Sequence, residues 1–231
     1  MPRVLITGAN RGLGLEFTRQ YLADGWAVIA ACRNPRAAEE LRRLEGSSTG
    51  SLTLVEMDVA DSASVQRAAA QVQSPSIDIV INCAGIFGGR AQSLGALDYD
   101  DWIQVLEVNV LGPARVSEAF LERLRRGERR LIVTLTSGMG SLADNTSGGS
   151  VLYRTSKAAV NMLMRTAAID LRPQQISCVV LNPGWVKTDM GGPNARITAQ
   201  ESVGAMRELI ARLGPEDSGR FYNYTGREYP W

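Results

Sequence analysis

A tyrosine and a lysine lie four residues apart in an apolar-patterned segment, in the stretch YRTSK at Tyr153–Lys157. On a helix, positions i and i+4 share one face, so the phenol and the ammonium would be neighbours. Such a pair is commonly an ordinary surface contact. Alternatively, the cation favours the phenolate and makes the tyrosine proton transferable near neutral pH. The pair alone favours the first interpretation, and the rest of the chain has to decide between them.

The 231-residue sequence contains no histidine. This excludes Ser-His-Asp and Cys-His hydrolases, together with histidine-ligated metal centres. Acid–base chemistry must therefore come from Tyr, Lys, Asp, Glu or Cys. The three cysteines, Cys32, Cys83 and Cys178, are widely separated and show no CxxC spacing. We expect neither a disulfide framework nor a metal site.

Composition narrows the class of protein further. A hydrophobic content of 45% supports one substantial core, and α/β folds of this length commonly form one domain, here residues 1–231. The net charge of +1 predicts no general attraction to nucleic acid or to an acidic membrane. No apolar run approaches the length of a membrane span, and the start MPRVLITGAN lacks the apolar region of a signal peptide. With the dispersed cysteines, this predicts a soluble cytoplasmic protein.

Short β-branched runs alternate with helical patterns along the chain. The strands are expected at Arg3–Thr7, Trp26–Cys32, Ser51–Met57, Ile77–Asn82, Arg130–Thr136, Ile176–Asn182 and Arg220–Tyr224. The helices are expected at about Gly12–Asp24, Pro35–Leu44, Ser62–Gln73, Asp98–Arg126, Ser150–Leu171 and Ala199–Leu213. Several strands are apolar almost without alternation, as parallel strands covered on both faces are. The pattern predicts an α/β fold: a Rossmann-type doubly wound parallel sheet of about seven strands, with helices on both faces and Gly/Ser-rich loops at 45–50 and 145–150.

A glycine-rich turn, TGANRGLG at Thr7–Gly14, follows the first expected strand and opens the first expected helix. Its glycines, Gly8, Gly12 and Gly14, have the spacing GxxxGxG. Glycines permit a tight turn and let a pyrophosphate approach backbone N–H groups at a helix N-terminus. Glycine also occurs in ordinary turns, but the position between strand and helix favours dinucleotide binding.

The end of the second expected strand bears on the ribose of that dinucleotide. An NAD site normally places a carboxylate there, whereas this chain has Arg33 in AACRN and a further arginine, Arg11, in the glycine turn. Two guanidinium groups suit a 2′-phosphate, although either arginine could instead point to solvent. The sequence therefore favours NADP(H) over NAD(H).

With these motifs in place, the chain resembles the short-chain dehydrogenase/reductase family. The motifs occur in order over essentially the full length: TGANRGLG, Asp58–Val59, NCAG at Asn82–Gly85, Asn109, Ser137, YRTSK, and NPGWVKTDM at Asn182–Met190. Within the family, the chain looks most similar to the compact carbonyl-reductase group related to sniffer and the C-factor proteins, including its ending SGRFYNYTGREYPW. The resemblance implies an oxidoreductase that transfers hydride to a carbonyl carbon.

The resemblance also implies a role for each catalytic position. Tyr153 would be the acid–base residue, and Lys157 would favour its phenolate and bind the nicotinamide ribose. Ser137 would hold the substrate oxygen beside the tyrosine. Asn109 would kink the long helix and anchor a water that connects Lys157 to solvent. Each of these residues alone has a plain structural explanation, but the four in family order favour Tyr153 as the catalytic acid.

The same match implies the cofactor contacts. Besides Tyr153, Lys157 and Arg33, they are Gly8, Asn10, Arg11, Gly12, Leu13, Gly14, Asp58, Val59, Asn82, Ala84, Gly85, Pro183, Gly184, Val186 and Thr188. Two departures from the family are visible. Cys83 stands where a second asparagine is usual, which makes the stability of that turn less certain. The 16-residue spacing from Ser137 to Tyr153 is slightly long, so SLADNTSGGS is expected to bulge near the substrate mouth.

A short substrate loop, at about 186–200, predicts an open site for a small carbonyl or alcohol: an aldehyde, ketone or quinone. Trp185 and Met190 would line an apolar pocket, or simply pack.

An alternative function is that of a dinucleotide-binding signalling protein similar to C-factor, with incidental turnover. A nucleotide-sugar epimerase is a third option, although little chain follows Met190 to build a sugar-binding subdomain. Family relatives pair through the two long helices, expected here at Asp98–Arg126 and Ser150–Leu171, or through the C-terminal helix and strand, which implies a homodimer or a tetramer.

Overall fold

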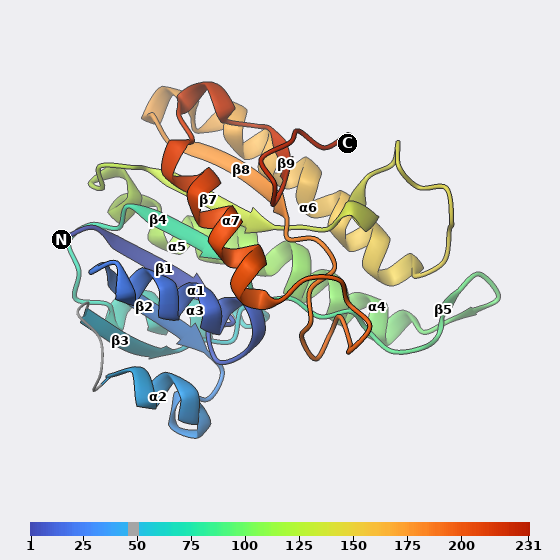
Figure 1. Ribbon diagram of the computed structural model, residues 1–231, viewed down its shortest axis with the longest axis horizontal. Coiled ribbons are helices and arrows are strands. Elements are labelled where there is room, and N and C mark those ends of the chain that lie inside the picture. The colour runs from blue at the N-terminus through green and yellow to red at the C-terminus, as the bar shows by residue number, and fades with distance from the viewer. Residues whose placement is uncertain (46–50) are drawn as a thin grey trace.

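Seven parallel strands form one central sheet in the order β3-β2-β1-β4-β7-β8-β9 (Figure 1). The structure is a computed structural model that describes residues 1–45 and 51–231. The strands are β1 (Arg3–Thr7), β2 (Ala27–Cys32), β3 (Ser51–Glu56), β4 (Ile79–Asn82), β7 (Leu131–Leu135), β8 (Ser177–Asn182) and β9 (Phe221–Asn223). The predicted doubly wound parallel sheet and all seven strands are confirmed. The predicted loop at 45–50 lies outside the described residues except for its first position.

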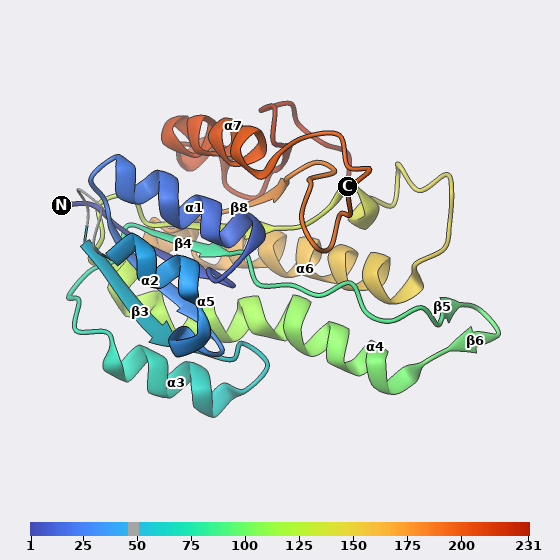
Figure 2. The same ribbon diagram turned by 60° about the horizontal axis from the view of Figure 1, so that its bottom comes forward.

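Helices cover both faces of the sheet, as Figure 2 shows from the side. One face carries α1 (Gly12–Ala23), α2 (Glu39–Glu45) and α7 (Ala199–Arg212), and the other carries α3 (Ser62–Gln71), α5 (Gly112–Arg125) and α6 (Val151–Asp170). Side chains alternate between faces along a strand, so Val4 and Ile6 pack in the first apolar core whereas Leu5 packs in the second. This double burial explains the nearly unbroken apolar strands of the sequence.

The long helix predicted at Asp98–Arg126 is interrupted. It consists of α4 (Tyr99–Leu106), one π-helical turn at Glu107–Leu111, and α5. Pro113 has no N–H to donate to the carbonyl four residues earlier, which is that of Asn109, so the regular α-helical ladder cannot continue there. The interruption includes Asn109, where the family resemblance implied a kink, and π turns of this kind often occur at functional sites.

Two local features differ from the prediction. The helix expected at Pro35–Leu44 begins with a separate 3₁₀ turn at Pro35–Ala37, where the Asn34 side chain accepts a hydrogen bond from the Ala37 N–H (3.2 Å). The sequence analysis also missed a small antiparallel hairpin of β5 (Gln92–Ser93) and β6 (Ala96–Leu97). Strands of two residues are too short for a periodic pattern.

The reversal of strand order lies between β1 and β4. Strand β1 pairs with β2 on one side and with β4 on the other, so the chain crosses from one half of the sheet to the other at this point. In open α/β sheets, ligands bind at the carboxyl ends of the strands beside such a switch point. The glycine turn after β1 and the NCAG motif after β4 both lie at this edge.

Candidate active site

The glycine turn leaves no room for a side chain at two of its three glycines. A Cβ on Gly8, whose φ is +65°, would lie 2.9 Å from the Ala84 Cα, and a Cβ on Gly14 would lie 2.3 Å from the Gly8 carbonyl oxygen. Helix α1 begins at Gly12, and among the described residues no side chain caps its first N–H groups. Uncapped N–H groups at a helix N-terminus attract anions, so the turn fits the pyrophosphate of a dinucleotide.

The turn after β4 is held to the end of β1 through Thr7. Its Oγ1 accepts hydrogen bonds from the N–H groups of Cys83 (3.0 Å) and Ala84 (3.1 Å). The sequence left the stability of this turn uncertain because Cys83 replaces an asparagine. The Thr7 hydroxyl stabilises the turn through backbone N–H groups, which do not depend on the cysteine side chain.

The two arginines predicted to bind a 2′-phosphate are arranged differently. Arg33 follows β2 directly and is exposed, and no hydrogen bond or ion pair to it occurs within residues 1–45 and 51–231. Arg11 instead forms an ion pair with Asp189 of the substrate loop (3.0 Å). Both of those side chains are largely exposed, so the pair is weak and a phosphate can compete for Arg11. Sequence reasoning missed this pairing.

Other predicted cofactor residues lie along the same edge, where several are tied into the fold. The Asp58 side chain accepts from the Ala60 N–H (3.0 Å), which shapes the turn after β3. The buried Asn82 amide donates to Thr134 Oγ1 on β7 (3.2 Å), so its side chain links two neighbouring strands. The predicted positions Asn10, Leu13, Val59, Pro183, Gly184, Val186 and Thr188 also follow strand ends at this edge.

Asn109 is buried in the π turn, and both polar atoms of its side-chain amide form hydrogen bonds. Its Oδ1 accepts from the Ile86 N–H (2.9 Å), and its Nδ2 donates to the Ile86 carbonyl (2.8 Å) and to Ser156 Oγ (3.0 Å). A Cβ on Gly85 would lie 3.3 Å from Asn109 Oδ1 and 3.7 Å from Lys157 Nζ. The two side chains thus face the same small space, as a relay between them requires.

Tyr153 and Ser137 meet at the floor of the site. Tyr153 lies in the first turn of α6 and is buried, and its side chain lines the same cavity as that of Ser137. Burial raises the pKa of Tyr153 to about 12, and the Ser137 side chain lowers it only in part. The phenol is therefore protonated at neutral pH, as a proton donor must be.

Lys157 lies one turn further along α6, with Nζ 5.6 Å from the centroid of the Tyr153 ring. The Nζ donates to the Leu135 carbonyl (2.9 Å), and burial lowers the pKa of Lys157 to about 8. We expected Lys157 to lower the pKa of Tyr153. In the structure, burial of the phenol raises its pKa and outweighs the contribution of Ser137, so a lowering by Lys157 stays a prediction.

The buried ammonium has a cost that a Lys157→Met variant should reveal. The unfolded chain holds this proton more tightly, so the charge destabilises the fold below pH 8, by roughly 3 kcal/mol, and this penalty disappears as the pH rises toward the ordinary value of 10.5. We expect the variant to have a higher thermal midpoint than the wild type at pH 7, with the difference shrinking by pH 10. Lys187→Met, at an exposed site, is the control. A lower midpoint for Lys157→Met at pH 7 would contradict the assignment.

A cavity of about 520 Å³ opens above Tyr153 and Ser137. Its lining is mainly apolar. It includes Leu13, Phe87, Met139, Asp144, Ser147, Arg154, Pro183, Gly184, Trp185, Val186, Thr188, Met190 and Tyr229. The predicted contribution of Trp185 and Met190 to an apolar pocket is confirmed, and the volume suits a small organic molecule.

The substrate loop is closed at its base by backbone pairing. Val186 pairs with Ile197, and the Lys187 N–H donates to the Ile197 carbonyl (2.8 Å). Thr188 reaches the glycine turn, because a Cβ on Gly12 would lie 3.5 Å from its Cγ2. The loop therefore spans from the substrate cavity to the dinucleotide edge.

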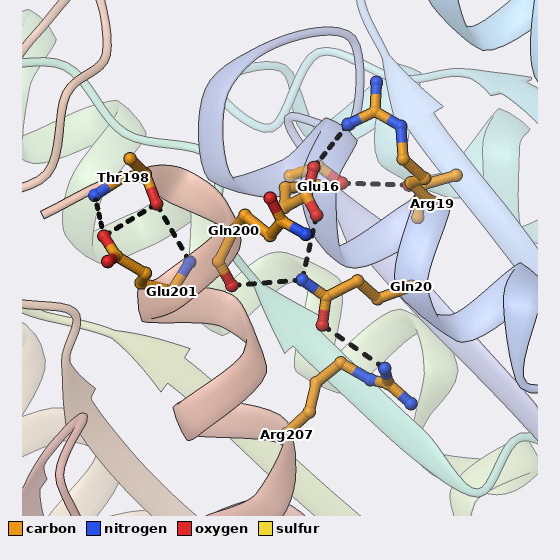
Figure 3. A network of polar contacts seen from close by, with 9 residues as sticks. Glu16, Arg19, Gln20, Thr198, Gln200, Glu201 and Arg207 are labelled. Atoms are coloured by element: carbon orange, nitrogen blue, oxygen red, sulfur yellow. Dashed lines mark hydrogen bonds and ion pairs between the residues drawn. The ribbon is translucent and has the colours of Figure 1, made fainter.

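Helix α7 continues from this loop and is fastened to α1 by the polar network in Figure 3. Gln20 donates to the Gln200 carbonyl (3.2 Å) and to the buried Glu16 (2.8 Å), and Arg207 donates to Gln20 (3.3 Å). Helix α1 starts in the glycine turn. The network thus fixes the C-terminal end of the substrate loop to α1, the helix that begins in the glycine turn.

Two residues that support Tyr153 escaped the sequence analysis. Gln92 on the small hairpin is buried, and its side chain accepts from the Tyr153 N–H (3.2 Å) while donating to the Phe87 and Gly89 carbonyls. The Phe87 ring packs on the Tyr153 ring at 4.7 Å. A single glutamine in a polar stretch carries no signal that it caps a distant helix.

The site brings a buried tyrosine, a serine and a lysine together below a cavity, beside an anion-binding glycine turn. Residues 2–197 match the family described as short chain dehydrogenase. The chain belongs to this family. In this short-chain dehydrogenase the four predicted catalytic positions converge from three separate elements: the π turn, the end of β7, and the first two turns of α6.

The relatives of this short-chain dehydrogenase confirm the narrower resemblance to the carbonyl-reductase and C-factor group. The chain is 48% identical over 163 residues to C-signal of Myxococcus xanthus, covering 71% of this chain and 98% of C-signal. The NADPH-bound carbonyl reductase from chicken fatty liver has 37% identity and a TM-score of 0.93, covering 100% of this chain and 99% of that one. The carbonyl reductase Sniffer of D. melanogaster has 31% identity and a TM-score of 0.93 over 100% of both chains.

Two features are absent from residues 1–45 and 51–231, the part of the chain that the structure describes. No helix in these ranges is long and apolar enough to cross a membrane. The same part of the chain holds no group of three or more Cys, Asp or Glu side chains placed to bind a metal ion.

Proposed function

We propose that this short-chain dehydrogenase is an NADP(H)-dependent reductase of small aldehydes, ketones or quinones. The observation that carries the proposal is that Ser137 and Tyr153 together line one mainly apolar cavity, which also reaches Leu13 of the glycine turn. Residues 1–231 would act as one dinucleotide-binding domain, with the substrate loop at about 186–200. A carbonyl oxygen that enters the cavity would meet both hydroxyl groups.

In this proposal, Tyr153 donates its proton to the carbonyl oxygen as the carbon is reduced. NADPH, when bound, supplies the hydride, and the N-terminus of α1 holds its pyrophosphate. Ser137 donates a hydrogen bond to the same oxygen and fixes its position. The raised pKa of Tyr153 keeps the phenol protonated between turnovers.

Lys157 and Asn109 would return the proton to Tyr153. The lowered pKa of Lys157, about 8, lets its ammonium exchange a proton near neutral pH. Asn109 faces the space beside Lys157 Nζ and is held rigidly by Ile86, so it can order a water between the lysine and the surface. The π turn gives Asn109 this position.

The direct test is consumption of NADPH or NADH by the purified protein over a panel of small carbonyls and quinones. We expect turnover with NADPH to exceed turnover with NADH. Absence of turnover on every substrate, despite binding of NADPH, would refute the reductase proposal.

Cofactor preference should depend on Arg33. Its exposed guanidinium, next to the strand end that borders the glycine turn, can hold a 2′-phosphate bidentately. We expect Arg33→Ala to raise the KM for NADPH about tenfold and to leave the KM for NADH unchanged, since a hydrogen bond to a charged group contributes roughly 1.5–3 kcal/mol. Arg36→Ala, which removes another exposed arginine nearby, is the control. An equal change for both cofactors would show that Arg33 does not contact the phosphate.

A second candidate function is signalling, and the similarity to C-signal is the observation that favours it. A signalling protein could bind the dinucleotide without turning over a carbonyl. Tight NADPH binding with no turnover would support this alternative. The Ser137–Tyr153 pair argues for the reductase, because a pure sensor requires no proton donor.

We further propose a cytoplasmic homodimer. All three cysteines are free thiols within the described chain, as is usual in a reducing compartment. Ile103 on α4 and Met162 and Ile169 on α6 are large apolar side chains that are more than half exposed (59%, 67% and 56%). Pairing of these helices would cover them, and light scattering at micromolar concentration would detect a monomer if the proposal is wrong.

A further inference from the structure

The segment Gly226–Trp231 folds back over the loop that joins Ser137 to Tyr153 (Figures 1 and 2). The Trp231 carbonyl accepts hydrogen bonds from the Ala143 N–H (2.9 Å) and from Ser141 Oγ (3.2 Å). The Tyr229 hydroxyl donates to Asp144 Oδ2 (2.5 Å). Three contacts therefore fasten this loop, which the sequence predicted to bulge, to a segment far away in the chain.

The Tyr229 ring has a rigid support. Its N–H donates to the Phe221 carbonyl on β9 (2.7 Å), and its ring packs on the fully buried Phe221 ring at 5.0 Å. The Trp231 ring packs on the same phenylalanine at 5.5 Å. Because β9 belongs to the central sheet, the position of Tyr229 is set by the core of the protein.

Tyr229 also lies beside the catalytic serine. A Cβ on Gly138, the residue after Ser137, would lie only 2.8 Å from the Tyr229 hydroxyl oxygen. Tyr229 lines the same cavity as Tyr153 and Ser137. The hydroxyl hydrogen is already donated to Asp144, and that hydrogen bond together with burial raises the pKa of Tyr229 to about 12. The Tyr229 side chain therefore limits the space for a substrate sterically and has no proton available for transfer to it.

We propose that Tyr229, held by Asp144, is a specificity-determining residue that limits the size of the carbonyl substituent on the Ser137 side of the cavity. The inference rests on the proposed reductase function. A substituent on that side of the carbonyl would meet the fixed tyrosine ring, because the serine places the oxygen next to it. A smaller side chain at this position would admit a bulkier group, whereas loss of the hydroxyl alone would leave the ring on Phe221.

The test compares the reduction of a methyl ketone with that of the matching phenyl ketone, with NADPH as the reductant. We expect Tyr229→Ala to raise the ratio of kcat/KM for the phenyl over the methyl ketone at least tenfold, since contacts in a pocket discriminate by such factors. Tyr229→Phe should keep the ratio within about twofold of the wild type. Tyr99→Ala, at an exposed site on α4, is the matched control and should leave both substrates unchanged. The KM for NADPH should not change in any variant.

An unchanged ratio in Tyr229→Ala would overturn the inference. If that variant does not fold, Tyr229→Leu keeps an apolar contact with Phe221 and should raise the ratio by a smaller factor. Calorimetric binding of the matching secondary alcohols separates this inference from the proposed function. Tighter binding of the phenyl alcohol to Tyr229→Ala than to the wild type supports the proposed size limit even when no variant shows turnover. Equal binding to the wild type and the variant refutes the proposed size limit.

Discussion

A Tyr153→Phe variant should reduce carbonyls about 10³-fold more slowly than the wild type while it still binds NADPH. General acid catalysis by a positioned side chain contributes typically 10²- to 10⁴-fold, and the phenylalanine has no proton to give. The ring itself should stay in place, because it packs on Phe87 and its N–H is held by Gln92. Single-turnover kinetics with NADPH would measure the chemical step directly.

The control for this variant is Tyr222→Phe. Tyr222 lies on β9 and donates its hydroxyl to Asp217, outside the cavity lining. Its substitution removes the same atom from a tyrosine that has no contact with the substrate. Retention of most activity in Tyr153→Phe, with NADPH affinity intact, would show that another group protonates the carbonyl oxygen.

The second large effect is expected for Gly14→Ala. The added methyl group would lie 2.3 Å from the Gly8 carbonyl oxygen and 2.8 Å from the carbonyl carbon, both backbone atoms that cannot rotate away. The turn must open to relieve this overlap. We expect a loss of at least about 100-fold in NADPH affinity and a free energy of unfolding lower by roughly 3 kcal/mol, as for an overpacked site. Calorimetric titration and chemical denaturation measure the two effects.

Gly204→Ala provides the comparison. This glycine lies in α7, and its added Cβ would meet only the Gln20 side chain, at 3.9 Å. Alanine is favoured over glycine inside a helix by roughly 1 kcal/mol, so this variant should be slightly more stable and should bind NADPH normally. If Gly14→Ala behaved in the same way, the glycine turn would not require its close backbone approach.

The strands and most helices were predictable because the order of apolar and polar residues indicates which side chains they bury. Val28 and Ile29 lie in different cores on opposite faces of β2, so the strand has to be apolar throughout. The kink at Asn109 was also predicted, through the family resemblance, and the structure adds its cause in Pro113. Patterns of this kind depend on neighbours in the chain, and a single sequence contains them.

The parts that escaped prediction depend on partners far away in the chain. Gln92 supports Tyr153 across 61 residues, and Arg11 pairs with Asp189 across 178. The periodic pattern of apolar residues within one segment carries no information about contacts between segments far apart in the chain. The pKa of Tyr153 is a similar case, because the spacing to Lys157 was correct whereas the depth of burial that dominates the pKa is set by the whole fold.

The contact between Tyr229 and the loop after Ser137 has a consequence for biosynthesis. The glycine turn and Tyr153 leave the ribosome well before Tyr229, which follows the last strand of the sheet. A domain generally folds as a unit, so a nascent chain from which Tyr229 has not emerged still lacks a part of that unit. The substrate cavity has no wall beside Ser137 until Tyr229 has emerged and docked on Phe221. The wall beside Ser137 is thus among the last parts of the molecule that synthesis makes available.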